Sequence, residues 1–401
     1  MKKLIYCFLA VLLPLHSCST IQVMEDNQVN DGHYRLYTYP HKPRIDNYDG
    51  ERFQKISILG LNDFEAQENA TEYPIKNRFD EKRILSIGGL TAMKTYIDLF
   101  KQNSINPVLT VDAGSFIKDS IDLNKSLFLY NYLNVDAANI GSNEYYFQAP
   151  KLKRDFIFKG LARKLKFPLL NNNITFLTDD TQMQELGVSP YSIKEVGDLK
   201  IGIIGTLTRA VAENSAQKKV KQTYIENSAK NIIVSANSLR KLGVDIVVVL
   251  LSRGTNCTAK QAKELGIIES KVNFDPRTSK YCDETEESFH QTLKLLPPQT
   301  VDVIFTSGRK AKVANFIEGI PVLQNLGKGQ YLSWIDLYFD KKHKVVAQDL
   351  TQIHQPIQLC HQFFKNSVDC FTDENFDNEE LIPATFLGHP VKIKNETLKT
   401  N

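Results

Sequence analysis

The sequence predicts an α/β fold in which short buried strands alternate with amphipathic helices. Strands are indicated by apolar runs of three to six residues, a pattern typical of strands that are buried on both faces. Helices are indicated by apolar side chains that recur every three or four residues between these runs. The alternation of the two patterns favours a layered α/β architecture. The five expected strands are 56–61, 108–111, 200–204, 246–251 and 303–305.

Two apolar stripes mark the expected helices. One runs from Leu90 to Phe100 and the other from Ile232 to Leu239, each with the spacing of one helix face. The second helix is expected to end near Gly243, directly before a strand, because glycine favours helix termination. Each stripe therefore supplies a layer that can cover the neighbouring strands.

After Gly329 the pattern changes to alternation. The run 331–339 alternates apolar and polar residues, and 345–350 is expected as its antiparallel partner after a turn. We therefore expect one main domain over residues 52–350. Residues 351–401 are expected to form an appendage that is stapled by a disulfide and packs back onto this domain.

Composition excludes several classes of protein. The 401 residues carry 49 Lys and Arg against 46 Asp and Glu, and 42% of them are hydrophobic. This balance is typical of a globular chain with a sizeable core, not of a disordered one. The net charge of +3 is too small and too dispersed to indicate a nucleic-acid partner. No internal apolar run reaches the roughly 18–20 residues of a spanning helix.

The N-terminus has the pattern of an export signal. Two lysines precede an apolar run from Leu4 to Leu15, so residues 1–18 are expected to be a signal peptide. The segment 15–18 resembles a bacterial lipobox, in which Cys18 would be lipidated and anchor the chain in a membrane. Residues 19–51 are polar and are expected to form a tether and lead-in. We expect an exported protein of the bacterial cell envelope, an outer-membrane lipoprotein that faces the periplasm or the surface.

Four cysteines remain outside this N-terminal segment. In an exported chain they predict two disulfides, and three pairings are possible. Proximity in the sequence favours Cys257–Cys282 and Cys360–Cys370. A zinc site is the competing interpretation, but no CxxC spacing is present.

Polar segments follow the expected strands. Ligands collect at the carboxyl ends of parallel strands in open α/β sheets, so these segments predict a site at one shared edge. Glycine or a small residue accompanies polar groups in most of them. The segments are 62–65, 112–115, 141–144, 252–254 and 306–311.

The order of these segments resembles the exported 5′-nucleotidase branch of the calcineurin-like metallophosphoesterases. The resemblance is collinear from Lys55 to Asp340 and covers only the N-terminal domain of that branch. It implies a metallophosphoesterase-type four-layer α/β/β/α sandwich with two mixed β-sheets. It also implies a pair of divalent metal ions that activate water for phosphoester hydrolysis. The family motifs N-D-x-H, D-x-G-D, G-N-H-E, S-H-x-G and G-H-x-H correspond to 62–65, 112–115, 141–144, 252–254 and 308–311.

The residues at these motifs depart from the family pattern. Arginine cannot offer a lone pair to a metal, and none of the eight histidines falls at a ligand position. We therefore expect no metal and no catalytic residue. A Mn²⁺- or Zn²⁺-type pair is expected only if hydrolysis is retained. Of the seven ligand positions only Asp63 matches, whereas Glu65, Ser115, Ser142, Arg253, Arg309 and Ala311 replace the rest; Asn143 stands in place of the catalytic His, and Glu144, which matches the family, is expected to be positional.

Two roles remain open for the arginines. They fill the former metal site inertly by pairing with Asp63 and Glu65, or they form a cationic pocket. In the second case Arg253, Arg309, Ser115 and Asn143 would bind a phosphate or carboxylate.

The preferred function is that of an exported, lipid-anchored pseudoenzyme that binds an envelope protein or a small anionic ligand. The alternative is a metal-dependent phosphoester hydrolase of the 5′-nucleotidase type with weak or unconventional activity. Only about fifty residues follow the main domain, so the nucleobase-stacking domain of two-domain nucleotidases is not expected.

Overall fold

The computed structural model describes most of the chain from residue 48 onward. By contacts the chain divides into two units, Met1–His33 and Tyr34–Asn401, and every described residue belongs to the second. None of the described helices is long and apolar enough to cross a membrane. The described residues are 48–76, 82–117, 123–146, 151–176, 183–209, 211, 223–254, 287–308, 312–365, 370 and 380–393.

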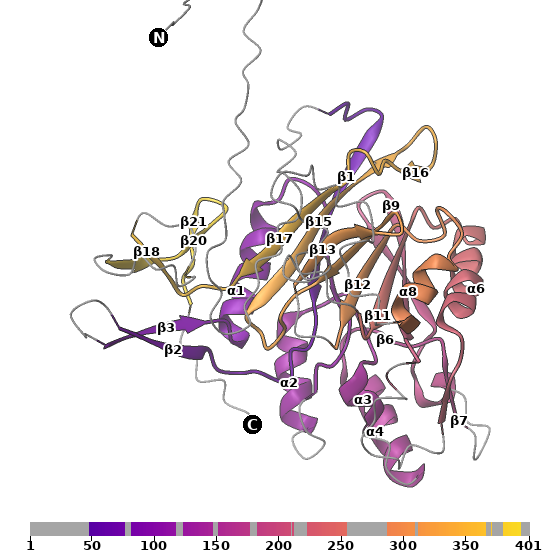
Figure 1. Cartoon of the computed structure of the whole chain (residues 1–401), viewed down its shortest axis with the longest axis horizontal. Coiled ribbons are helices and arrows are strands. Elements are labelled where there is room, and N and C mark those ends of the chain that lie inside the picture. The colour runs from indigo at the N-terminus through magenta and orange to yellow at the C-terminus, as the bar shows by residue number, and fades with distance from the viewer. Residues whose placement is uncertain are drawn as a thin grey trace, which may run out of the picture. The chain divides into compact units, whose positions relative to one another are not determined.

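A seven-stranded mixed sheet forms the first layer of strands (Figure 1). Four of its strands are parallel, and β15 runs antiparallel beside β1. Both β16 and β17 pair with β15. The strands are β1 (Phe53–Leu61), β4 (Val108–Asp112), β5 (Ala137–Asn139), β6 (Leu169–Leu170), β15 (Tyr331–Asp340), β16 (Val345–Val346) and β17 (Gln352–Gln358).

A six-stranded mixed sheet forms the second layer. Its central strands are parallel and the two edge strands are antiparallel to their neighbours. In spatial order the strands are β13 (Val313–Ile317), β14 (Ile320–Gln324), β12 (Val303–Ser307), β11 (Ile246–Ser252), β9 (Leu199–Leu207) and β8 (Tyr191–Val196).

The two sheets pack face to face, and helices cover their outer faces. One fully buried cluster joins side chains of both sheets, such as Ile58 and Val248. Alternate residues of the first sheet, such as Leu59, instead pack with α1 (Leu90–Asn103), α2 (Leu123–Leu133) and α4 (Lys151–Lys164). The second sheet packs with α6 (Ser228–Lys241) and α8 (Glu287–Lys294). Each fully buried apolar side chain in these clusters contributes about 1.5–3 kcal/mol to stability through the hydrophobic effect. This order of layers confirms the predicted α/β/β/α sandwich.

All five strands expected from apolar runs are present, as are both expected helices. The side chain of Asn227 caps α6 by accepting from Lys230 N at 3.0 Å. The remaining described elements are short: β2 (Thr71–Lys76), β3 (Lys82–Ile87), α3 (Ser142–Tyr146), β7 (Ile174–Phe176), the 3₁₀ helix Met183–Leu186, β10 (Thr223–Ile225), β18 (Gln362–Phe364), β19 (Leu381–Pro383), β20 (Thr385–Phe386) and β21 (His389–Pro390).

The C-terminal part is more closely integrated than expected. The strand expected at 345–350 ends at Val346, and β17 continues the first sheet from residue 352. The expected domain boundary at residue 350 therefore falls inside this sheet. The reason is geometric: β15 is long enough to pair with both β16 and β17 along one edge.

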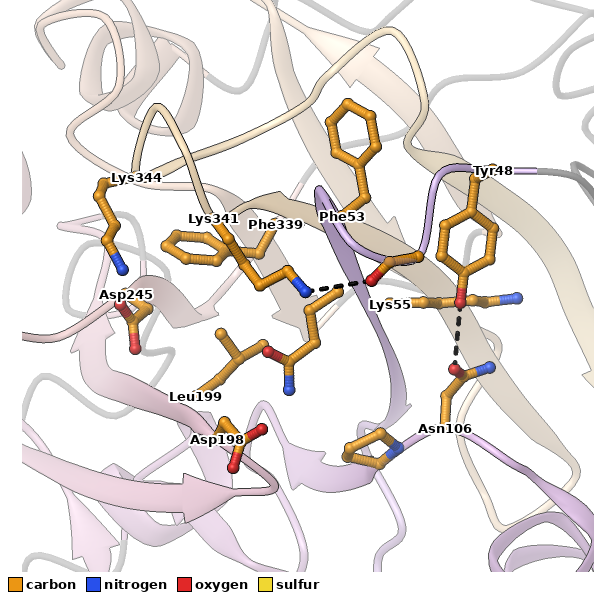
Figure 2. A pocket seen from close by; sticks show the side chains of 13 residues that line it. Tyr48, Phe53, Lys55, Asn106, Asp198, Leu199, Asp245, Phe339, Lys341 and Lys344 are labelled. Carbon is orange, nitrogen blue, oxygen red and sulfur yellow. Dashed lines mark hydrogen bonds between the residues drawn. The ribbon is translucent and has the colours of Figure 1, made fainter.

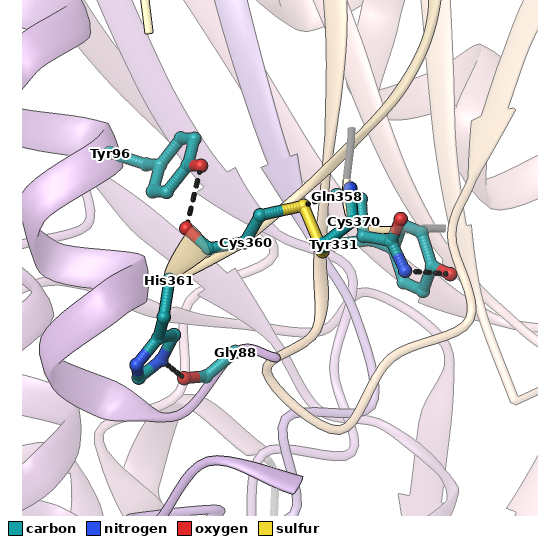
Figure 3. Close-up of a disulfide and its surroundings, with 7 residues drawn as sticks. All are labelled: Gly88, Tyr96, Tyr331, Gln358, Cys360, His361 and Cys370. Carbon is teal, nitrogen blue, oxygen red and sulfur yellow. Dashed lines mark hydrogen bonds between the residues drawn. A yellow bond between two sulfur atoms is a disulfide. The ribbon is translucent and has the colours of Figure 1, made fainter. Parts of the chain in front are cut away.

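A disulfide closes a loop in the chain after β17, and a hydrogen bond from α1 reaches one of its cysteines. Cys360 and Cys370 are bonded, with 5.6 Å between their Cα atoms, in the pairing that sequence proximity favoured. Tyr96 Oη donates to the carbonyl of Cys360 at 3.0 Å, and His361 Nε2 lies 2.9 Å from the carbonyl of Gly88 (Figure 3). The other favoured pair, Cys257–Cys282, lies outside the described residues, as do Cys18 and the expected signal peptide.

Candidate functional site

The structure brings the predicted polar segments together at the carboxyl ends of the parallel strands. Gly308 N donates to both carboxylate oxygens of Asp63, at 3.0 and 2.8 Å, which joins a loop of each sheet. We call this edge of the sandwich the rim. It comprises residues 62–65, 112–115, 141–144, 252–254 and 306–308.

Asp63 is fixed at the rim by protein donors. It follows β1 with a left-handed φ of 47°. Besides Gly308 N, the amide of Asn62 donates to its carboxylate at 2.9 Å, and Asn62 is itself held by the backbone of Asn325. Burial raises the pKa of Asp63 to about 6, although the bonds from Asn62 and Gly308 oppose the increase. Both carboxylate oxygens are therefore already engaged by N–H groups.

Glu65 lies close enough to Asp63 for the two carboxylates to repel each other. Its backbone N donates to the carbonyl of Ser115 at 3.2 Å, and its own φ is 50°. In the described residues Asn62 and Gly308 N bind Asp63, and the pairing of Asp63 and Glu65 with Arg253 and Arg309 stays a prediction. Arg309 and Ala311 lie outside the described residues.

Glu144 ties two loops of the rim to each other. Its buried carboxylate accepts from the backbone N of Ser115, Ile117 and Gly141 at 2.8–2.9 Å. Burial raises the pKa of Glu144 to about 7 in spite of these three bonds. The loops approach so closely that a Cβ on Gly141 would lie 2.6 Å from the carbonyl carbon of Gly114. Glu144 therefore positions the rim, as expected for this residue.

A second carboxylate is buried beneath the rim. Asp112 ends β4 and accepts from Gly114 N at 2.6 Å and from the hydroxyl of Tyr130. Burial raises the pKa of Asp112 well above its usual range. Ser115 is buried close by, with a left-handed φ of 63°. Its hydroxyl lies beside the Asp63 carboxylate and, by hydrogen bonding to it, tends to lower the pKa of Asp63.

Three serine hydroxyls link the two sheets across the rim. Ser142 Oγ lies 3.4 Å from Ser252 Oγ, which lies 3.2 Å from Ser307 Oγ. Ser307 Oγ donates to the carbonyl of Ala113 at 3.0 Å. Ser252 and Ser307 were not predicted as site residues, although both lie in the predicted polar segments 252–254 and 306–311. These hydroxyls lie at the rim, where the resemblance implies metal ligands.

The other two predicted residues are held by backbone contacts. Asn143 Nδ2 donates to the carbonyl of Ile117 at 2.9 Å, and this hydrogen bond connects the loops that carry the two residues. Arg253 is half-buried with a left-handed φ of 71°, and its N donates to the carbonyl of Ser307 at 2.8 Å. The rim therefore places Arg253, Ser115, Ser142 and Asn143 on adjoining loops.

No family model matches the chain, but a comparison of sequences finds relatives among the 5′-nucleotidases. Snake venom 5′-nucleotidase from Naja atra is 24% identical over 299 residues, which cover 73% of this chain and 52% of the relative. Human 5′-nucleotidase is 21% identical over 309 residues, which cover 73% and 48%. The cell wall protein Lmo0130 of Listeria monocytogenes is 24% identical over 56% of this chain and 32% of its own length. The chain spans about half the length of the 5′-nucleotidases it matches.

Solved structures agree with the sandwich described above. A putative 5′-nucleotidase from Staphylococcus aureus, in complex with alpha-ketoglutarate, superposes with a TM-score of 0.54 at 16% identity, covering 81% of this chain and 57% of that one. The calcineurin-like phosphoesterase YfkN from Bacillus subtilis gives 0.50 at 19% identity, covering 76% and 89%. The chain has the calcineurin-like phosphoesterase fold. As the order of the motifs predicted, its sequence relatives include 5′-nucleotidases.

The donor groups at the rim do not fit the dimetal centre that a phosphoesterase fold of this branch implies. Such a centre needs carboxylate and imidazole ligands around two divalent ions. Here neutral hydroxyls stand at two of the positions, Ser115 and Ser142, and a guanidinium at a third, Arg253. The carboxylate of Asp63 is bound by two N–H groups. Among the described residues, no three His, Cys, Asp or Glu side chains are grouped so that they could hold a metal ion.

Proposed function

We propose that this chain is an exported, non-catalytic homologue of the 5′-nucleotidases that binds an anionic ligand or a protein partner at the rim. The observation that carries the proposal is the chemistry of the donor set. Hydroxyl and N–H groups stand where the catalytic relatives need metal ligands. Hydroxyls and a guanidinium are suited to bind a phosphate or carboxylate, not a divalent cation.

The proposed anion site consists of Arg253, Arg309, Ser115 and Asn143. Support comes from the buried hydroxyl of Ser115, which lies beside Asp63, and from the half-buried position of Arg253 beside Ser307. Asp63 lies close to Ser115 and opposes an anion when it is ionised. Binding of sulfate, an anion that does not itself titrate in this range, should therefore strengthen as the pH falls through about 6, where Asp63 becomes protonated.

A second candidate is a metal-dependent phosphoester hydrolase, and the names of the relatives favour it over the first. All but one of the sequence relatives quoted above are 5′-nucleotidases. In this case activity would require a donor arrangement other than the one the family motifs supply.

One experiment separates the two functions. The purified protein is assayed with AMP and with p-nitrophenyl phosphate, with and without added Mn²⁺ or Zn²⁺, and phosphate binding is measured by calorimetry. The proposal predicts no metal-dependent turnover, and phosphate binding that Arg253→Gln weakens. Turnover that chelator abolishes would establish the hydrolase instead.

Localisation and anchoring complete the proposal. The lipobox at 15–18 and a cell wall protein among the relatives support an envelope protein that is held in a membrane through acylated Cys18. No nucleic-acid partner is proposed. Mass spectrometry of the membrane fraction tests acylation, and a Cys18→Ala chain should then appear in the soluble fraction.

A further inference from the structure

A cleft opens at the opposite end of the strands from the rim. Its volume is about 450 Å³, within the range of small-molecule sites. Phe53 and Leu199, the first residues of β1 and β9, line it together with Gln54, Pro107 and Phe339 (Figure 2). The rim follows the last residues of the same strands, so the cleft is separate from the site proposed above.

Opposite charges line the two sides of this cleft. Lys341 and Lys344 come from the turn between β15 and β16 of the first sheet, whereas Asp198 and Asp245 directly precede β9 and β11 of the second. Figure 2 shows Lys344 extending from this turn toward Asp245, whereas the amine of Lys341 is directed at the carbonyl of Gly50. Within the described part of the chain, these four side chains form no ion pair with one another.

Lys55 is a fifth charged residue at the cleft, but it is already neutralised. Its Nζ lies 2.9 Å from the carboxylate of Asp336, which is buried on the helix-covered side of the first sheet. The charges left to face a ligand are therefore two cations and two anions.

The fold holds these groups in place. Lys341 Nζ donates to the carbonyl of Gly50 at 3.0 Å, and Asp245 Oδ2 accepts from Lys200 N at 2.9 Å. The turn that carries Asp198 is packed against the entry to β4, because a Cβ on Gly197 would lie 2.9 Å from Pro107 Cγ. These contacts hold Lys341, Asp245 and the turn that carries Asp198 in place at the cleft.

We propose that this cleft binds a zwitterionic small molecule. Its anionic group would face Lys341 and Lys344, its ammonium group would face Asp198 and Asp245, and its hydrocarbon part would lie over Leu199. A ligand with a single charge is attracted by one side and repelled by the other, so the two effects largely cancel. A ligand with both charges is attracted by both sides, and this selects for zwitterions.

Matched probes test this assignment on the whole protein. Three ω-amino acids of increasing length, γ-aminobutyrate, δ-aminovalerate and ε-aminocaproate, are compared with caproate and hexylammonium by calorimetry and by ligand-dependent shifts in melting temperature. At least one ω-amino acid should bind about fivefold more tightly than either singly charged probe, the effect expected for an exposed ion pair.

Paired variants test the residues. Lys344→Gln and Asp245→Asn should each weaken that binding about fivefold. The control Lys342→Gln on the same turn and the control Glu195→Gln on β8 should leave it unchanged, because neither residue lines the cleft. Asparagine at position 245 can still accept from Lys200 N, so folding is preserved. The proposal is overturned if no ω-amino acid binds, if caproate binds equally well, or if the two cleft variants behave like the controls.

Discussion

Replacement of Gly141 by alanine should destabilise the protein far more than an ordinary glycine substitution. The new Cβ would overlap Ser115 N and lie 2.6 Å from the carbonyl carbon of Gly114 and 2.7 Å from Ser115 Oγ. Ordinary contacts of a Cβ lie at 3.4 Å or more. The two rim loops must therefore separate.

The magnitude follows from what that separation breaks. Overpacking of this kind costs about 1–3 kcal/mol. The displaced loops also lose bonds from Ser115 N and Gly141 N to the buried carboxylate of Glu144, and a buried group left unsatisfied costs about 1–3 kcal/mol. We expect Gly141→Ala to lower the free energy of unfolding by about 3–5 kcal/mol.

Gly160 supplies the matched control. It lies within α4, and a Cβ there would meet nothing within 4 Å. Gly160→Ala should raise the free energy of unfolding by about 0.5–1 kcal/mol, because alanine favours the helix. Urea denaturation followed by circular dichroism measures both variants. Equal stability of Gly141→Ala and Gly160→Ala would refute the close approach of the loops at the rim.

Three further predictions concern buried charge and the disulfide. The pKa of Asp63 is about 6 in the folded state and 3.8 in its usual state, so the free energy of unfolding should fall as pH rises from about 4 to 6. Asp63→Asn should flatten this dependence in denaturation curves and add about 1–2 kcal/mol of stability at neutral pH, less than the nearly 3 kcal/mol of the full pKa change because the residue is partly exposed. An unchanged pH profile in this variant would contradict the prediction. Burial tends to raise the pKa of Asp336, but hydrogen bonds and charges from His354 and Lys55 lower it to about 2, so the stabilisation by this carboxylate is present above pH 4 and lost as pH falls toward 2. Asp336→Asn should lower the free energy of unfolding by about 3 kcal/mol at neutral pH and remove the acid transition. Wild-type behaviour of this variant would show that Asp336 does not pair with His354 and Lys55. Cys360 and Cys370 are ten residues apart, and replacing both by serine should lower the free energy of unfolding by about 3 kcal/mol. If neither reductant nor this double substitution changes the melting temperature, the disulfide does not form in solution.

The apolar strands were predictable because burial on both faces leaves a strong signal. The run 246–251 matches β11 (Ile246–Ser252), in which every residue is buried. By contrast β17 (Gln352–Gln358) was missed, because it is mostly polar and contains Pro356. Its pairing with β15 is a long-range contact, and no local periodicity reports it.

The composition of the rim was predictable from the order of the motifs, but its hydrogen bonds were not. Charge bookkeeping alone led us to pair Asp63 with an arginine. In the structure the left-handed backbone at Asp63 and Gly308 lets the N–H of Gly308 donate to the Asp63 carboxylate. A contact of this kind depends on the conformation of the loop backbone, so the identity of the side chains does not predict it. The link between Ser252 and Ser307 is equally non-local, because it joins neighbouring strands of the second sheet.

Elemental metal analysis of the full protein, purified without chelator, tests most directly whether the rim is a metal centre. A 5′-nucleotidase with intact motifs, prepared in the same way, serves as the positive control. The donor set at the rim predicts no stoichiometric transition metal in this protein, and no gain in melting temperature when Mn²⁺ or Zn²⁺ is added. About two equivalents of a transition metal per chain, the content of a dimetal site, would contradict the proposal and establish the hydrolase alternative as the working function.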